Sequence, residues 1–576
     1  MPAAALDRQI LRGPGISLLA TVLLLGCAAQ EGADTGAADL VVRGGNVITL
    51  ADPPRAEAVA VLGGEIVFVG SDADAADWVG EGTEVIDLAG ATVVPGLIEG
   101  HGHYLGTGEE MLQLDLASAR RWSDIVAKVE EAAAAATPGE WILGRGWHQE
   151  KWDAVPEGPV VEGVPLHASL SAVSPENPVL LTHASGHAAF VNARALDLAG
   201  IDASTPDPEG GTIVRDASGA ATGLLRETAQ GLVAAARGSG FDEARAREAA
   251  RLAAEEALRH GITSFQDAGS SVDEIRLLQK LDAEGALPVR LWVMIRADND
   301  TMTRSLPELL AVPASETLVL GGIKKSLDGA LGSHGAWLLE PYSDLPSTSG
   351  LNTVPLSEVE GAAELAREHD LQLCIHAIGD RANREVLDLF EAQFAAEGEL
   401  PSQRRWRIEH AQHLHPDDIP RFAELGVVAS MQGVHCTSDG PWVPQRIGDE
   451  RAEQGAYVWR KLIDSGARVS NGTDVPVEEI DPLASLDASM TREMPSGEIF
   501  YGDQVMTPEE ALRSYTLEAA YAAFQEDRKG SIEVGKLGDL TVVSADPLAV
   551  APATVSDLEV LYTIVGGEVA YRGGEE

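Results

Sequence analysis

Short apolar runs alternate with helical stretches through the middle of this 576-residue chain. The run I-T-S-F-Q-D-A, for example, follows the helical pattern D-E-A-R-A-R-E-A-A-R-L-A-A-E-E-A-L-R-H. Eight such runs occur, at residues 93–104, 262–268, 289–296, 321–329, 371–380, 405–412, 427–432 and 467–474. Because strands interleaved with helices form parallel sheets covered by helices, this pattern predicts an α/β protein with a (β/α)8 TIM barrel. Catalytic groups of such a barrel lie at the C-terminal ends of its strands.

Both ends of the chain carry short β-rich runs separated by Gly-Gly turns. D-L-V-V-R-G-G-N-V-I-T-L lies near the start and V-L-Y-T-I-V-G-G-E-V-A-Y-R near the end. This shared pattern predicts that residues 39–95 and 528–576 pair in one small β-sandwich. The barrel then covers residues 96–527, with an insertion at about 105–208 that does not fit one βα unit. The insertion is rich in Gly, His and Trp, which suits loops that close over a site.

The first 27 residues have the order of an export signal. Arg8 and Arg12 precede an apolar run at 16–25, which is too short to span a bilayer as a helix. The L-L-G-C that follows resembles the lipobox of bacterial lipoproteins, in which the cysteine, here Cys27, is acylated. We therefore expect a protein anchored by lipid in the bacterial cell envelope, on the periplasmic face of a membrane, with residues 28–38 as a flexible tether. The alternative is an ordinary cleaved signal with an incidental cysteine.

Composition limits the partners and the covalent framework. Asp and Glu total 90 against 42 Lys and Arg, for a formal net charge of -48, which argues against nucleic acid or an anionic membrane surface as a partner. We expect a small-molecule substrate and membrane contact only through the lipid anchor. A homodimer is one possible assembly state. Only Cys374 and Cys436 follow Cys27, which is too few for a disulfide framework.

Two histidines, His101 and His103, close the first run in P-G-L-I-E-G-H-G-H. Because side chains alternate faces along a strand, both point the same way, and a barrel strand directs them to the axis. Imidazoles are good ligands for zinc or a similar divalent metal, although H-x-H alone is a weak signal. Three later runs also end in ligand types, at His376, His410 and Asp474. Five such groups at the ends of separate strands predict a metal site.

These motifs resemble the metal-dependent amidohydrolase superfamily, in the branch called amidohydrolase family 3, which includes N-substituted formamide deformylase-like enzymes. The matching segments run from about residue 39 to 574 and are P-G-L-I-E-G-H-G-H, G-R-G-W, G-H-A-A-F-V-N, K-K-S-L-D-G-A-L-G-S, H-A-I-G-D-R-A-N, E-H-A-Q, N-G-T-D-V-P and G-K-L-G-D-L-T-V-V-S-A-D-P. Together they are specific for the family and not for a substrate. The resemblance implies a metal-bearing barrel with a β-sandwich made from both chain ends.

The resemblance also implies a role for Lys324. In related enzymes a lysine at the end of the fourth barrel strand is carboxylated, and its carbamate bridges two metals. Lys324 and Asp328 share a strand face in K-x-x-x-D-G, whereas Lys325 faces the opposite way. The alternative is an unmodified Lys324 paired with Asp328 beside a single metal. The expected cofactor is thus one or two divalent ions per chain, with zinc favoured, and N6-carboxylysine at Lys324 if there are two.

Other residues are candidates for substrate contact. His435 in S-M-Q-G-V-H-C ends the seventh run; the family often has Gln-Pro there, so Gly433 is a departure that affects how the backbone places His435. His183 and His187 in the insertion are candidate pocket residues, with a purely structural role as the alternative. Cys374 is expected to be a small packing residue inside the barrel.

The ligand set and the resemblance together lead to one predicted reaction, hydrolysis of a non-peptide amide or a related C–N bond. A water whose pKa is lowered by the metal attacks a carbonyl carbon, and Asp474 accepts its proton and returns it to the leaving nitrogen. His101, His103, His376 and His410 would hold the metals, with Lys324 as the bridge. Two alternatives stay open: hydrolysis of an ester at the same metals, and a non-catalytic surface lipoprotein that binds a solute.

Overall fold

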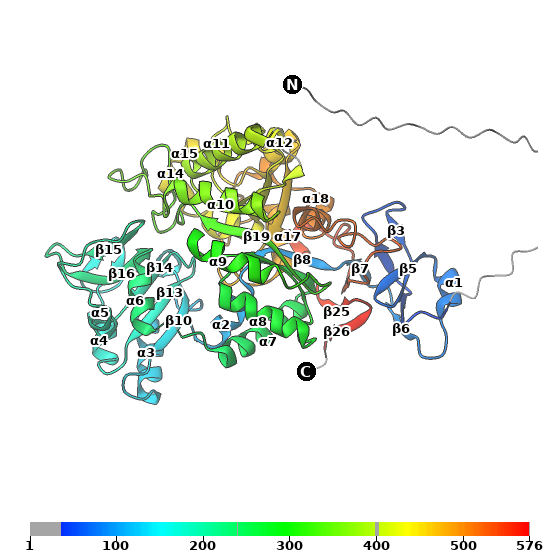
Figure 1. The fold of residues 1–576 in the computed structure, drawn as a ribbon, viewed down its shortest axis with the longest axis horizontal. Helices are drawn as coiled ribbons and strands as arrows, with labels where there is room; N and C mark the ends of the chain where they lie inside the picture. Colours follow the sequence, from blue (N-terminus) through cyan, green and yellow to red (C-terminus); the bar gives the residue numbers. More distant parts are fainter. Residues whose placement is uncertain (1–35, 239, 398–402, 575–576) are drawn as a thin grey trace, which may run out of the picture. The chain divides into compact units, whose positions relative to one another are not determined.

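Eight parallel strands form the central sheet of the protein (Figure 1). The computed structural model describes residues 36–238, 240–397 and 403–574, and the chain from Ala37 onward is one compact unit. Cys27 and the predicted export signal lie outside the described residues. In sheet order the strands are β8 (Leu97–Gly102), β17 (Ile262–Ser270), β18 (Arg290–Ile295), β19 (Leu318–Ser326), β20 (Gln372–Ala377), β21 (Arg407–His410), β22 (Val428–Gln432) and β23 (Arg468–Gly472).

The first and last strands of this sheet meet, which closes it into a barrel. The N–H of Asp474, just after β23, donates to the carbonyl oxygen of His101 in β8 at 2.7 Å. The buried carboxylate of Glu99 accepts from the N–H of Thr473 at 2.8 Å and from its hydroxyl at 2.9 Å. This seam places the end of the last strand directly beside His101 in β8 and His103, which follows this strand.

Helices cover the outside of the barrel, and their sequences explain how they pack. The buried face of α7 is made almost entirely of alanines three and four residues apart, from Ala246 to Ala257, which is the spacing of one helix face. Gly108 of α2 lies against it, and a Cβ there would be 1.8 Å from the carbonyl oxygen of Ala249. Ser271 and Glu274 form a capping box at the start of α8. Among the described helices, none is long and apolar enough to cross a bilayer.

Along the chain, these helices alternate with the barrel strands. They are α2 (Tyr104–Met111), α7 (Glu243–Arg259), α8 (Val272–Ala283), α9 (Asn299–Leu309), α10 (Leu356–Glu368), α11 (Asp380–Glu397), α12 (Ile419–Leu425), α13 (Gly433–Asp439), α14 (Val443–Ile447), α15 (Asp449–Gly455), α16 (Trp459–Ser465), α17 (Pro482–Thr491), α18 (Pro508–Ser514) and α19 (Leu517–Ala522).

Two further sheets contain both ends of the described chain. One has the order β5-β4-β1-β6 and the other β26-β25-β24-β7-β2-β3. Within the second sheet, Val542 from the C-terminal segment pairs with Val93 from the N-terminal segment. Apolar side chains of both sheets share one buried cluster, which includes Val42, Val61 and Leu540. The predicted fold class, a barrel with a β-sandwich built from both chain ends, is confirmed.

The strands of this sandwich are short. They are β1 (Leu40–Arg43), β2 (Asn46–Ile48), β3 (Arg55–Ala56), β4 (Ala58–Leu62), β5 (Glu65–Gly70), β6 (Glu84–Asp87), β7 (Thr92–Pro95), β24 (Leu540–Val543), β25 (Val560–Val565) and β26 (Glu568–Arg572), with the helix α1 (Asp72–Ala75) after β5.

An additional six-stranded sheet is inserted between β8 and β17, with the order β15-β16-β14-β13-β10-β9. It has its own apolar cluster, which includes Trp147, Leu181 and Phe190. The predicted end of the insertion at residue 208 is too early, because the hairpin of β15 and β16 follows it. Both strands are apolar runs like those of the barrel, and only the antiparallel pairing of β16 with β14 assigns them to this sheet.

The elements of the insertion are β9 (Leu114–Asp115), β10 (Ile142–Trp147), β13 (Val179–His183), β14 (Ala188–Val191), β15 (Gly211–Arg215) and β16 (Ala221–Glu227), with α3 (Trp122–Ala135), α4 (Ala168–Val173), α5 (Ala193–Ala199) and α6 (Gln230–Arg237). A small ribbon of β11 (Val160–Val161) and β12 (Val164–Pro165) accompanies them.

Candidate metal centre

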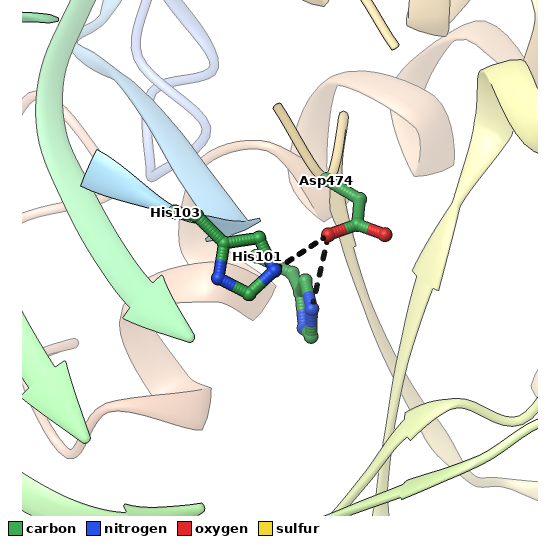
Figure 2. A group of neighbouring side chains, drawn as sticks. All are labelled: His101, His103 and Asp474. Carbon is green, nitrogen blue, oxygen red and sulfur yellow. Dashed lines mark ion pairs between the residues drawn. The ribbon is translucent and has the colours of Figure 1, made fainter. Parts of the chain in front are cut away.

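His101 and His103 both face the carboxylate of Asp474 (Figure 2). Nε2 of His103 lies 3.2 Å and Nε2 of His101 lies 3.5 Å from the same oxygen, Oδ1. The two histidines therefore share one side of β8, as strand alternation requires. The glycines between and before them make room for the neighbouring strands, because a Cβ at Gly100 would lie 2.2 Å from the carbonyl oxygen of Asn471.

Asp474 occupies an unusual backbone position at the end of the last barrel strand. Its φ is 61°, in the left-handed region that residues with a side chain seldom adopt. The residue is only 5% exposed. Burial raises the pKa of its carboxyl, but the contacts with His101 and His103 outweigh burial and hold this pKa well below its usual value. Asp474 is therefore an anion at the centre of the group.

A second group of possible ligands shares Asp474 with the first. The ligand atoms of His410, His435 and Asp474 lie within 4.8 Å of one another, as do those of His101, His103 and Asp474. The ring of His376 lies beside that of His410, with centroids 4.4 Å apart. All the histidine and aspartate ligands predicted from the sequence are thus brought together at the C-terminal ends of barrel strands.

His435 lies closer to these ligands than expected for a residue that only contacts substrate. Its Nε2 is 3.9 Å from Oδ2 of Asp474. It does not end the seventh strand as predicted, because β22 stops at Gln432 and His435 lies in α13. The departure at Gly433 has a steric reason: a Cβ there would lie 2.4 Å from Oγ of Ser489 in α17.

Hydrogen bonds on the far side of each imidazole fix its orientation. Nδ1 of His101 donates to the buried carboxylate of Glu409, which also accepts from Nε of Arg407 at 2.7 Å. Nδ1 of His410 donates to Oε1 of Gln432 at 2.8 Å. Although burial raises the pKa of Glu409, Arg407 and His101 hold it well below its usual value. These contacts leave the Nε2 atoms of His101 and His410 directed at the centre, which is the usual outer support of metal-binding histidines.

Glu409 is a functional candidate that the sequence interpretation missed. Strand alternation predicts that Glu409 and His410 point to opposite faces. His410 has a φ of 74°, however, and its ring lies beside those of His101 and His376, while the carboxylate of Glu409 lies behind His101 and accepts from its Nδ1. The only signal in the sequence is that Glu409 directly precedes a predicted ligand.

The chemistry of the donor set fits a divalent metal. Four buried polar atoms of this group have no hydrogen-bond partner among the described residues: Nε2 of His101, His376 and His435, and Oδ1 of Asp474. Burial lowers the pKa of His376 and of His410 well below the usual value, so both rings are neutral and can offer a lone pair. Buried polar atoms that lack a hydrogen-bond partner are costly unless something binds them, and neutral imidazoles with a carboxylate suit zinc and related ions.

The two lysines of β19 lie in different surroundings. Lys324 is 2% exposed, and burial lowers its pKa to about 8, against the opposing influence of Glu409 and Asp474. Nζ of Lys325 donates instead to the carbonyl oxygen of Ala297 at 2.9 Å, so this side chain points away from the ligand group.

Asp328 is not an ion-pair partner of Lys324 in the described part of the chain. Its carboxylate accepts from the N–H groups of Trp337 at 2.9 Å, Ile378 at 3.0 Å and Gly379 at 2.8 Å. Burial nevertheless raises the pKa of Asp328 to about 7. The pairing required by the alternative of an unmodified Lys324 beside Asp328 is therefore not found.

The ligand group opens into a cavity of about 730 Å³. His187 of the insertion lines it, and Nδ1 of His187 donates to Glu227 at 2.8 Å. His183 instead has both ring nitrogens occupied, at 2.8 Å from Oγ of Ser185 and 3.1 Å from Oε1 of Gln149, which favours a structural role. Glu227, which ends the last strand of the insertion, also lines the cavity, and no sequence pattern indicated it.

Cys374 is fully buried. It belongs to an apolar cluster with Trp292 and Met294 of β18 and Ala268 of β17, and burial raises the pKa of its thiol. Its surroundings are those of a packing residue inside the barrel.

A barrel with buried histidines and an aspartate around one point at its catalytic end is a metal-dependent hydrolase by class. Within that class, the chain belongs to the Amidohydrolase family, whose sequence profile matches residues 84–571. The predicted family is thus confirmed, and the protein is a metal-dependent amidohydrolase that acts on C–N bonds.

Known proteins are similar to this chain over most of its length. It is 35% identical to Protein LONG AFTER FAR-RED 3 of Arabidopsis thaliana, over 93% of this chain and 92% of the relative. It is 30% identical to the N-substituted formamide deformylase of Arthrobacter pascens, over 93% of this chain and 98% of the relative. A solved structure of an uncharacterized metal-dependent hydrolase from Pyrococcus horikoshii is 26% identical, with a TM-score of 0.72 over 89% of this chain and 99% of that one.

Proposed function

We propose that the protein hydrolyses a non-peptide amide, or a related C–N bond, with water activated at the metal centre. The observation that carries this proposal is the set of buried ligand atoms around Asp474 that have no hydrogen-bond partner among the described residues, at the wall of a cavity large enough for a small molecule. The likeness to a deformylase of N-substituted formamides supports an amide as substrate.

Each side chain has a defined part in the proposed reaction. His101, His103, His376 and His410 hold the metal, and His435 and His187 contact the substrate. A bound divalent cation supplies Lewis-acid activation of water and of the substrate carbonyl. Asp474 accepts the proton of the attacking water as the C–O bond forms, and it returns this proton to the nitrogen as the C–N bond breaks. His183 shapes the adjoining wall through its two hydrogen bonds.

We propose zinc as the metal, because imidazole nitrogens and one carboxylate are its common ligands. The test is metal analysis of the purified full chain together with turnover of matched amides and esters. Bound zinc and faster hydrolysis of the amides are expected. Hydrolysis of the esters alone would favour the ester alternative, and tight binding of a solute without any turnover would favour a binding protein.

We propose further that Lys324 carries a carbamate when two metals bind. The ammonium loses one proton, and the neutral amine then adds to CO2, with formation of an N–C bond and loss of a second proton, so that a cation becomes an anionic oxygen ligand. Its burial beside Asp474 and Glu409 supports this, since a free ammonium beside two divalent cations would be repelled strongly.

Lys324→Ala should lower the metal content from two ions toward one per chain, and a short carboxylic acid should restore part of it. Lys325→Ala is the matched control, because Lys325 points to Ala297 and Glu358 instead. One metal per chain in both the wild type, purified with bicarbonate, and Lys324→Ala would exclude the bridge.

We propose that the protein is exported and anchored through Cys27, on the basis of the basic start, the apolar run and the L-L-G-C that follows. Labelled fatty acid should enter the wild type, and Cys27→Ser should be released from membranes. Wild-type protein without any label would contradict the anchor.

A further inference from the structure

Four permanently or usually cationic side chains line the cavity: Arg145, Lys324, Lys325 and Arg296. Three of them have an assigned role or partner. Arg145 donates to the carbonyl oxygen of Ala184 at 3.0 Å, Lys325 donates to Glu358 at 3.3 Å, and Lys324 is the proposed metal bridge. Arg296 is the cation of this wall that remains to be explained.

The guanidinium of Arg296 makes no hydrogen bond, and no ion pair within 4.0 Å, with any described residue. Its side chain is exposed and lines the cavity, and it directly follows β18, at the catalytic end of the barrel. An arginine on an open surface can remain solvated at little cost, but a guanidinium that lines a substrate cavity without a protein partner is available to a ligand.

The backbone holds Arg296 beside the metal centre. A Cβ at Gly269 would lie 3.0 Å from Cβ and 3.1 Å from Cδ of Arg296, and 3.3 Å from Cγ of Lys324. The two stems therefore cross the same face of this glycine, whose φ is 130°. Gly269 lies in an irregularity of β17, between the residues paired with Val293 and Ile295. An extra residue at this point of the strand thus makes space for Arg296 next to Lys324.

The acidic groups whose charges act on Arg296 are Glu274, Glu227 and Asp474. Each has another partner: Glu274 caps α8, Glu227 accepts from His187 at 2.8 Å, and Asp474 lies among the predicted ligands. The N–H groups of the guanidinium that face the cavity are thus available to a ligand.

We propose that Arg296 binds a carboxylate of the substrate, so that the enzyme acts on amides carrying a free carboxylate a few bonds from the scissile C–N bond. This inference rests on the amide hydrolysis proposed above. A guanidinium matches a carboxylate with two parallel hydrogen bonds. The aliphatic parts of Arg296 and Lys324 lie side by side. A small substrate whose amide is held at the metal centre can therefore place its carboxylate at the guanidinium of Arg296.

The test compares matched substrates on the metal-loaded full chain. The substrates are N-formylglycine, N-formyl-β-alanine and N-formyl-4-aminobutyrate, each paired with its own carboxamide. Wild type should show a kcat/KM at least about tenfold higher for the best carboxylate than for its carboxamide, the size of effect expected of a charged hydrogen bond. Arg296→Gln should reduce that ratio to about one, and Arg296→Lys should retain part of it.

Arg304→Gln is the control for loss of one positive charge, because Arg304 lies exposed on α9, outside the cavity wall. Its carboxylate preference should equal that of wild type. The melting temperature of each variant separates misfolding from loss of recognition. An equal substrate ratio in wild type and Arg296→Gln would overturn the inference.

Glutarate binding, measured by calorimetry, separates this inference from the proposed function. Binding that Arg296→Gln weakens at least about tenfold, in a protein that hydrolyses none of the amides, would support the carboxylate site and count against amide hydrolysis. Turnover of the carboxamides without any carboxylate preference would overturn the inference and leave the proposed function standing. Absence of both glutarate binding and turnover would overturn both.

Discussion

Left-handed backbone at His410 and Asp474 brings together side chains that regular strands would separate. Their φ values are 74° and 61°. Such conformations cost on the order of 1–3 kcal/mol each and persist only where the surroundings determine them. Here the surroundings are the hydrogen bond of His410 to Gln432 and that of the Asp474 N–H to His101. At the scale of single residues, the centre is thus held by contacts outside the ligand atoms.

Asp474→Asn should lower kcat by about two to four orders of magnitude, because an amide cannot accept the proton of water at neutral pH. Folding should be retained, since Asn fills the same space. The measurement is kcat on the amide panel, with the circular dichroism spectrum as the check on folding. Asp464→Asn is the matched control, because Asp464 is a surface residue paired with Arg460. A near-normal rate for Asp474→Asn would remove this residue from the proton-transfer role.

Glu409→Gln should weaken metal binding by about 10–100-fold, the usual effect of losing the group that orients a ligating histidine. It removes the charge that faces both His101 and Arg407. Metal content after dialysis against graded chelator measures the effect. Glu385→Gln is a suitable control, because Glu385 pairs with Arg381 in α11, outside the ligand group. Unchanged metal content in Glu409→Gln would mean that His101 is held without Glu409.

At the scale of elements, the barrel and the segment that leads to the sandwich are joined by a buried lysine. Nζ of Lys529 donates to Oγ of Ser264 in β17 at 2.8 Å. Burial lowers the pKa of Lys529 from 10.5 to about 7, although Asp539 opposes this shift. A buried ammonium is costly, so the folded state favours the neutral amine.

The stability of the protein should therefore depend on pH through Lys529. The folded pKa is lower than the unfolded one, so between about pH 7 and pH 10.5 the unfolded chain binds more protons. The free energy of unfolding of wild type, relative to Lys529→Met, should thus rise with pH across this window, by at most about 1.4 kcal/mol per unit. Below pH 7 the difference should be constant. Urea unfolding of both proteins at several pH values measures it, and a flat difference from pH 7 to 10 would contradict the shift.

At the scale of the whole molecule, a formal net charge of -48 means that acidic side chains repel one another over the surface. The cavity wall carries charges of both signs, since Arg145, Arg296 and two lysines line it together with six acidic side chains, among them Glu227 and Asp474. An anionic ligand is therefore favoured only at short range, beside individual cations, while salt screens the distant repulsion.

Added salt should therefore stabilise the folded protein. Raising NaCl from about 10 mM to about 150 mM shortens the Debye length from about 30 Å to about 8 Å, which weakens self-repulsion in the compact state. The melting temperature of the metal-loaded chain should rise by a few degrees. The test is the melting temperature, measured by calorimetry at several NaCl concentrations with the free metal concentration held constant. A fall in melting temperature would show that attractive ion pairs, such as Arg247 with Glu284, outweigh the repulsion.

Sequence patterns were sufficient for the fold class and for the family, since both depend on local features. Each barrel strand is a short apolar run, and the ligand residues lie at the ends of these runs, as with His376 in L-C-I-H-A-I-G-D. The position of an inserted hairpin was not predictable, because β15 and β16 are short runs with apolar residues, as barrel strands are, and only the pairing of β16 with β14 assigns them to the inserted sheet.

By itself, the sequence determined the barrel, the sandwich from both chain ends and the residue types at the centre, because periodicity and strand-end position are local properties. Only the tertiary structure decided how these residues meet. Glu409 reaches His101 although 308 positions separate them, and the side chain of Arg296 lies beside that of Lys324 where the chain has Gly269. Such relations depend on closure of the barrel and on backbone angles that depart from regular strands, and no local pattern encodes either.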